Sequence, residues 1–197
     1  NNGCPNTGID TVFMTVNPVP VASLTGTTLF CEGLNEIYTG TSSIAGSTFG
    51  FAIDGNPALP GATYNASALL AGSHVVTVIV TSPGGCIDST TINVTVLDNP
   101  IVSISGSGTI CSGELATFIG SGASTYQYYL NGAPISTGAV YSSSALNNGD
   151  IVSLVGTSGA SCVSVNSAQV IMNVTTTPTV TFVSDDADSI LCTGQLV

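Results

Sequence analysis

The chain has 197 residues, of which 11 are Asp or Glu and none is Lys or Arg, so its formal net charge is −11 at pH 7. A chain without cations lacks the basic surface that nucleic acids and anionic membrane surfaces require. It also lacks the Arg and Lys side chains on which phosphate sites and many carboxylate sites depend. Hydrophobic residues make up 43% of the chain, which favours a folded protein over a disordered one. The apolar runs are too short to cross a bilayer, so we expect no direct membrane insertion.

The sequence repeats itself with a period of about 80 residues, which is typical of tandem arrays. Pro20, Pro100 and Pro178 each open a similar stretch, which reads PVASLTGTTLFCEG, PIVSISGSGTICSG and PTVTFVSDDADSILCTG. The period predicts four pieces: the last strand of a preceding repeat at 1–19, complete repeats at 20–99 and 100–177, and the first strand of a following repeat at 178–197.

In chain order, residues 9–16 read IDTVFMTV, a run whose last part places apolar residues at the alternate positions Val12, Met14 and Val16, and they predict a strand. In the first complete repeat, Phe49, Phe51 and Ile53 alternate in the same way and predict a half-buried strand. Asp54-Gly55 follows at once, and such a dipeptide between apolar runs indicates a hairpin turn.

In the second repeat, Tyr126, Tyr128 and Leu130 alternate and are followed by Asn131-Gly132, the same combination of strand and turn. The apolar runs there predict strands at 101–105, 114–120, 125–131, 134–142, 150–157 and 165–174. Several short strands in about 80 residues, separated by turn residues, predict an immunoglobulin-like sandwich. The expected fold is therefore all-β, with immunoglobulin-like β-sandwich repeats stacked end to end.

Three motifs of the second repeat carry a family resemblance: ICSGE at 110–114, YQYYLNG at 126–132 and LNNGD at 146–150. Together with a late Cys before a Pro joint, they resemble the immunoglobulin-like or PKD-like tandem repeats of giant cell-surface, gliding-type adhesins of Bacteroidota. Those adhesins are exported by the type IX secretion system, and such repeats serve mostly as spacers. The first repeat departs at Cys31–Leu34 and has an insertion before Phe49, and the third has three extra residues before Cys192.

The six cysteines fall into two recurring series, Cys31, Cys111 and Cys192 in a Cys-x-Gly turn, and Cys4, Cys86 and Cys162 before a late strand. Their spacing and the single His favour a disulfide framework over a zinc site.

Pairing within a repeat would join Cys31 to Cys86 and Cys111 to Cys162. A strand of about seven residues, roughly 24 Å, separates the two positions, whereas a disulfide needs Cα atoms within about 7 Å. We therefore predict an inter-repeat disulfide between Cys31 and Cys162. The partners of Cys4, Cys86, Cys111 and Cys192 would lie in repeats outside this sequence. Pairing within each repeat and free thiols are the alternatives.

Other candidate sites are weaker. Asp185, Asp186 and Asp188 form the densest acidic cluster and could bind Ca²⁺, with a solvated acidic loop as the alternative. Asn65, Asn93 and Asn173 begin Asn-x-Ser/Thr sequons and are candidate glycosylation sites.

His74 and Tyr129 complete the candidates. Without a nucleophile elbow, His74 reads as an exposed loop residue rather than a triad member, and no enzymatic activity is expected. Tyr129 is an outward aromatic that could anchor a sugar or a protein, although scattered surface aromatics are common.

The sequence thus favours a non-catalytic structural or spacer segment of a long extracellular adhesin or surface filament at the cell surface. Its expected partners are neighbouring repeats of the same protein and identical chains in a filament or bundle. Two alternatives stay open: a glycan- or protein-binding adhesion module, and a self-assembling fibre in which the strand at 9–16 adds to another chain.

Overall fold

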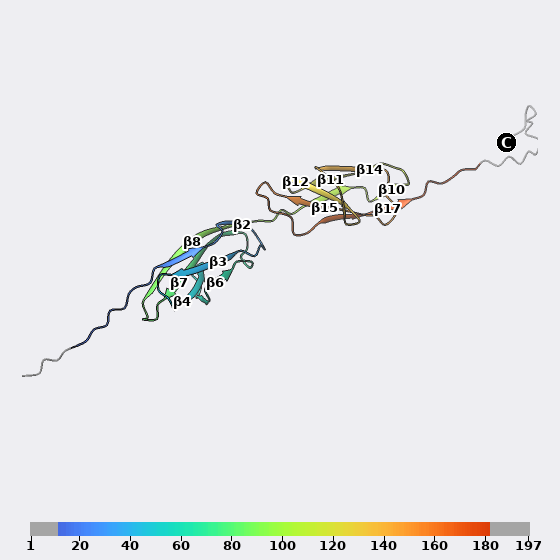
Figure 1. Ribbon diagram of the computed structural model, residues 1–197. Helices are drawn as coiled ribbons and strands as arrows, with labels where there is room; N and C mark the ends of the chain where they lie inside the picture. Colours follow the sequence, from blue (N-terminus) through green and yellow to red (C-terminus); the bar gives the residue numbers. More distant parts are fainter. Residues whose placement is uncertain (1–11, 182–197) are drawn as a thin grey trace, which may run out of the picture. The chain divides into compact units, whose positions relative to one another are not determined.

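The computed structural model describes residues 12–181 and divides the chain into two compact units, Asn1–Asn99 and Pro100–Val197. All regular elements of the described residues are β-strands (Figure 1). The predicted all-β class is confirmed. No helix among these residues is long and apolar enough to span a membrane.

The first unit is a two-sheet sandwich. One sheet has the order β1-β3-β6 and the other the order β2-β8-β7-β4-β5. The strands are β1 (Ala22–Thr25), β2 (Leu29–Cys31), β3 (Ile37–Ser42), β4 (Thr48–Ile53), β5 (Leu59–Pro60), β6 (Thr63–Asn65), β7 (Gly72–Thr81) and β8 (Ile87–Leu97).

The second unit has a similar arrangement, with sheets β14-β11-β9 and β13-β12-β15-β16 and a separate pair β10-β17. Its strands are β9 (Ser103–Gly106), β10 (Thr109–Cys111), β11 (Ala116–Ser121), β12 (Thr125–Leu130), β13 (Ala133–Thr137), β14 (Val140–Ser143), β15 (Ile151–Thr157), β16 (Ala168–Ile171) and β17 (Asn173–Thr175). This is the predicted immunoglobulin-like sandwich. The single strand predicted at 165–174 is wrong, because β16 pairs with β15 and β17 pairs with β10.

The single strand predicted at 134–142 is wrong. It is two strands, β13 and β14, which belong to different sheets. Gly138 lies between them with a φ of 106°, a value that L side chains rarely adopt, so the chain turns from one sheet to the other there. The apolar pattern of the sequence does not reveal that the chain changes sheets at Gly138, because apolar and polar side chains alternate both before and after the turn.

The opening of each unit is also divided between two sheets. In the first unit, β1 pairs antiparallel with β3, and β2 then pairs parallel with β8. The chain crosses at Gly26, where a Cβ would lie 2.2 Å from the Tyr38 ring. The main chain passes directly over the Tyr38 ring, the largest fully buried side chain of the unit. Only glycine, which has no Cβ, permits this approach.

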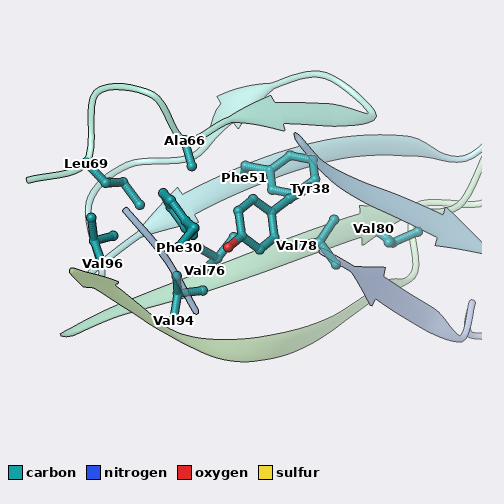
Figure 2. Packing of buried hydrophobic residues seen from close by; sticks show 10 residues of the cluster. All are labelled: Phe30, Tyr38, Phe51, Ala66, Leu69, Val76, Val78, Val80, Val94 and Val96. Carbon is teal, nitrogen blue, oxygen red and sulfur yellow. The ribbon is translucent and has the colours of Figure 1, made fainter. Parts of the chain in front are cut away.

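Alternating side chains of the central strands fill each core, as the sequence predicts. Figure 2 shows ten buried side chains of the first unit gathered between its strands, among them Phe51 from β4 and Val76, Val78 and Val80 from β7. In the second unit, Tyr128 takes the position of Phe51 and is fully buried.

Both cores contain a cluster of three aromatic rings. The fully buried Tyr of the cluster is on a different strand in each unit. In the first unit the buried Tyr38 lies on β3 and Phe51 on β4, and Tyr64 stacks on Phe51 at 6.0 Å. The Tyr38 hydroxyl donates to the Thr27 carbonyl. Burial accordingly raises the pKa of Tyr38, with the Glu36 carboxylate adding to the effect.

In the second unit the buried Phe118 lies on β11 and Tyr128 on β12, and Tyr141 stacks on Phe118 at 6.0 Å. The Tyr128 hydroxyl lies 3.1 Å from the Ala139 carbonyl and 3.3 Å from that of Phe118. Each core thus buries one Phe and one Tyr on facing sheets, with the hydroxyl hydrogen-bonded in both.

Replacing Tyr128 with Phe tests the hydroxyl contribution. We expect a loss of about 1 kcal/mol in the free energy of unfolding, the usual contribution of one hydrogen bond. The loss is at the low end for a buried group because the Ala139 carbonyl still accepts from the Gly120 amide at 2.8 Å. Urea denaturation followed by circular dichroism measures it. The matched control is Tyr129→Phe, which removes a hydroxyl from the opposite face of the same strand; an equal loss in both variants would contradict the assignment.

Candidate functional site

The parallel ladder between the second and last strands fixes the positions of the cysteines in the first unit. Cys31 ends β2 and lies opposite Leu97, the last residue of β8, while Cys86 lies immediately before β8. The 11 residues of β8 therefore separate the two cysteines. At roughly 3.3 Å per residue the separation is about 35 Å, far beyond the reach of a disulfide.

The second unit repeats this placement. Cys111 ends β10 opposite Thr175, the last residue of β17. Cys162 lies next to the isolated bridge between Thr157 and Val163, at the other end of β15 from Ile151. The two cysteines of this unit are again at opposite ends of the sandwich.

Cys31 and Cys162 are disulfide-bonded, whereas Cys86 and Cys111 are free. Pairing within each repeat, as Cys31 with Cys86 or Cys111 with Cys162, is therefore wrong, and so is the alternative that Cys31 and Cys162 are free thiols. The predicted bond between Cys31 and Cys162 stays a prediction. Cys4 and Cys192 lie outside the described residues.

Cys86 and Cys162 occupy the same local structure, which we call the serine turn. In the first unit the Ser82 amide donates to the Cys86 carbonyl at 2.9 Å, and the Cys86 amide lies 3.2 Å from the Ser82 hydroxyl. In the second unit the corresponding distances for Ser158 and Cys162 are 2.8 and 3.1 Å. The two turns hold their cysteines in the same way although one is oxidised and the other is not.

Cys31 and Cys111 occupy a second common structure, which we call the strand end. Each is followed by a residue whose amide donates back to the last strand, Glu32 to Leu97 at 2.9 Å and Ser112 to Thr175 at 2.8 Å. The next residue in each unit is a glycine with a φ close to 80°. The strand end therefore also has one disulfide-bonded and one free member.

His74 differs from its expectation as an exposed loop residue. It lies in β7, with a side chain that is 16% exposed, and its Nδ1 lies 2.8 Å from Asp54 Oδ2. Its Nε2 lies 2.8 Å from the Leu70 carbonyl. Both ring nitrogens thus face acceptors, which only the protonated imidazolium satisfies, since a neutral ring has one N–H.

Asp54 is the hairpin residue that precedes Gly55, and it has a φ of 52°. Its second oxygen accepts from the Val75 amide at 2.8 Å. In the second unit Asn131 does the same for the Ile151 amide at 2.9 Å, and its side-chain amide donates to Asp150. The turn residue thus binds the start of the neighbouring strand in both units, but only the first unit uses an ion pair. Sequence reasoning missed this pair. The signal was that two equivalent positions differ together between the repeats: Asn131 corresponds to Asp54, and Asp150 corresponds to His74.

The ion pair makes a pH-dependent contribution to stability. The hydrogen bond to Asp54 raises the pKa of His74, and the hydrogen bond from His74 lowers the pKa of Asp54. For a raised His pKa the contribution is complete below the unfolded value of 6.5 and is lost as pH rises through the folded pKa. For the lowered Asp pKa it is complete above 3.8 and is lost as pH falls through the folded pKa.

We expect the His74 ring to titrate above pH 6.5, and the stability difference between the unmodified chain and His74→Gln to shrink as pH rises through that pKa. Because His74 is the sole histidine, its ring proton resonances give the pKa directly by NMR. The matched control is Asp54→Asn, which keeps the turn of the second unit and removes the charge. An unchanged pKa in that variant would contradict the pairing.

The remaining predicted site residues have separate outcomes. Asp185, Asp186 and Asp188 lie outside the described residues, and within residues 12–181 no group of three or more His, Cys, Asp or Glu could hold a metal ion. The three sequon residues Asn65, Asn93 and Asn173 are all exposed.

Tyr129 lies in a groove on the outer face of β12, β13 and β15. The groove has a volume of about 680 Å³, and Gln127, Thr137, Val155 and Thr157 are among its lining residues. No charged side chain lines it. The strand β13 forms one wall, and its register against β12 shifts between Tyr128 and Tyr129.

No protein-family model matches the sequence, and no curated protein matches it. Among solved structures, the chain is similar to fibronectin(III)-like modules of Clostridium thermocellum CbhA, with 12% identity, a TM-score of 0.41 and coverage of 77% of this chain and 95% of that one. It is also similar to the solved chain of a structure that concerns host cell surface retention of a 1.5-MDa bacterial ice-binding adhesin, with 14% identity, a TM-score of 0.39 and coverage of 82% of this chain and 67% of the solved chain.

A third similar structure is a Ca²⁺-stabilized adhesin that helps an Antarctic bacterium bind ice, with 14% identity and a TM-score of 0.38. The match covers 83% of this chain and 50% of that one, so this chain corresponds to half of that adhesin structure.

Proposed function

We propose that the chain is a structural segment of a long extracellular adhesin or surface filament, in which the sandwich units are non-catalytic spacers. The observation that carries the proposal is the placement of the cysteines at opposite ends of each unit. A unit that has one cysteine at each end, and no disulfide between these two cysteines, can form a disulfide with each of its two neighbours in a series. Disulfide-bonded Cys31 and Cys162 also favour an oxidising location outside the cytosol.

The sequence motifs support the finer assignment. The ICSGE, YQYYLNG and LNNGD segments resemble repeats of Bacteroidota gliding-type adhesins, and export by the type IX secretion system would follow from that membership. The same resemblance supports neighbouring repeats of one long protein as the partners of this segment.

The central part of the proposal is a disulfide between Cys31 and Cys162. Both are oxidised and each lies in a different unit. Among the described residues, the register excludes Cys86 as the partner of Cys31 and Cys111 as the partner of Cys162. Such a bond would restrain bending at a junction where domains otherwise move.

The bond would also change how the chain carries tension. Force applied to the two termini would pass through the disulfide, since a covalent bond does not extend. Strands β3 to β15, which contain most of both cores, lie between Cys31 and Cys162 in the sequence and would be shielded. A spacer held in this way resists stretching even if its units are only moderately stable.

Single-molecule force spectroscopy tests the proposal directly. The segment between Cys31 and Cys162 would contribute roughly 450 Å of extended length, at about 3.5 Å per residue. We expect the oxidised chain to release that much less length on unfolding than a Cys31→Ser/Cys162→Ser variant. Treatment of the unmodified chain with a reductant should remove the difference, and equal lengths before reduction would contradict the proposal.

Peptide mapping identifies the bond independently. The chain has no Lys or Arg, so trypsin has no cleavage site, and pepsin at low pH is the suitable protease because acid also suppresses thiol exchange. We expect a non-reduced digest to contain a peptide pair that joins Cys31 to Cys162.

The groove at Tyr129 favours a second candidate function, a glycan-binding module. Its aromatic ring, side-chain amide and threonine hydroxyls suit a neutral saccharide, and the absence of cations disfavours anionic ligands. A glycan array with the unmodified chain and Tyr129→Ala tests it, and Tyr129→Phe is the control that keeps the ring. Binding that Tyr129→Ala does not reduce would exclude the groove.

A further inference from the structure

The two free cysteines belong to different structural classes. Cys86 is in a serine turn and is partly exposed, and Cys111 is at a strand end and is exposed. Their counterparts, Cys162 in the other serine turn and Cys31 at the other strand end, are both disulfide-bonded. The oxidised and the free sets therefore each contain one member of each class.

The main chain around each free cysteine matches that around its oxidised counterpart, while the Cys86 thiol donates to the Asn17 carbonyl at 3.6 Å and the Cys111 sulfur accepts from the Thr175 hydroxyl at 4.0 Å. The serine turn around Cys86 matches that around Cys162 to within 0.1 Å in the two Ser–Cys hydrogen bonds, which are 2.9 and 3.2 Å against 2.8 and 3.1 Å. The strand ends match as closely in the hydrogen bond that follows each cysteine. Within residues 12–181, the length of β8 separates Cys86 from Cys31, and the length of β15 to β17 separates Cys111 from Cys162, so neither free cysteine reaches the other class within its own unit.

We propose that Cys111 of one molecule forms a disulfide with Cys86 of a second copy of this chain, and that repetition of this bond links copies head to tail. This inference rests on the proposed Cys31–Cys162 bond, which would join the same two classes. Because the contact joins two different classes of cysteine, it is heterologous, and each copy keeps one free cysteine at which a further copy can be added.

The reaction is thiol–disulfide exchange with a small-molecule disulfide such as oxidised glutathione. The Cys111 thiolate attacks one sulfur of that disulfide and releases one glutathione thiolate. The Cys86 thiolate of the second copy then attacks the Cys111 sulfur and releases the other. Two protein thiols lose two protons and two electrons, and one oxidised glutathione becomes two reduced molecules.

Charge decides the conditions under which copies can meet. Each copy has a net charge of −11, so copies repel one another at low ionic strength. In 1 M NaCl the Debye length is about 3 Å, which removes most of that repulsion. The bond should therefore form more readily at high salt, unlike an association held by opposite charges.

The test is a complementation experiment with the full chain, in which Cys4 and Cys192 are replaced by Ser. In a glutathione redox buffer at 1 M NaCl, we expect this chain to form a ladder of oligomers on non-reducing gels. The further variants Cys86→Ser and Cys111→Ser should each stay monomeric by themselves. An equal mixture of the two should form a dimer and nothing larger, because only one bond of the required kind is available.

Peptic mapping of the same samples separates the two hypotheses. Loss of the Cys31–Cys162 peptide pair would contradict the proposed function. Its presence without a Cys86–Cys111 pair would overturn only the inference made here. Dimers in either single variant, or linkage of Cys86 to Cys86 or of Cys111 to Cys111, would also overturn it. Urea denaturation of each Ser variant confirms that the fold is intact.

Discussion

The parallel ladder between the second strand and the last strand is the constraint on which the arrangement of each unit depends. It requires the opening of the unit to leave the first sheet and join the second, and the close approach of Gly26 to the Tyr38 ring makes that crossing possible. Once β2 is aligned with the end of β8, Cys31 is fixed at one end of the sandwich and Cys86 at the other. The register therefore decides which disulfides can form, because it places the two cysteines of one repeat too far apart to bond to each other.

The two units reach the same packing with different residues. The buried hydroxyl is on β3 in the first unit, at Tyr38, and on β12 in the second, at Tyr128, and in both it donates to a main-chain carbonyl. The polar link between the hairpin and β7 or β15 varies in the same way, as an ion pair at Asp54 and His74 and as an amide–carboxylate pair at Asn131 and Asp150. The fold constrains the volume and the hydrogen bonding at these positions more strongly than it constrains the residue type.

The composition has mechanical consequences. Without Lys or Arg, the surfaces of the units have no cation other than a protonated His74 with which to form side-chain ion pairs, so attraction between units or copies has to come from apolar contacts, hydrogen bonds or covalent bonds. A disulfide is the strongest of these, and it does not weaken as salt rises. This is a physical reason for a chain of such low charge density to place cysteines at the ends of its units.

The sequence by itself determined the all-β class and the alternation that buries Phe51 and Tyr128, because these depend on local periodicity. The separation of Cys31 from Cys86 was predicted from the connectivity of the expected sandwich, and the β2–β8 register sets its length. Only the tertiary structure decided that the segment at 134–142 turns at Gly138 into a different sheet, and that His74 meets Asp54 across a strand pair. Those features depend on which distant strands become neighbours. A single sequence specifies such pairings through the sum of many weak contacts, and no local pattern reports that sum.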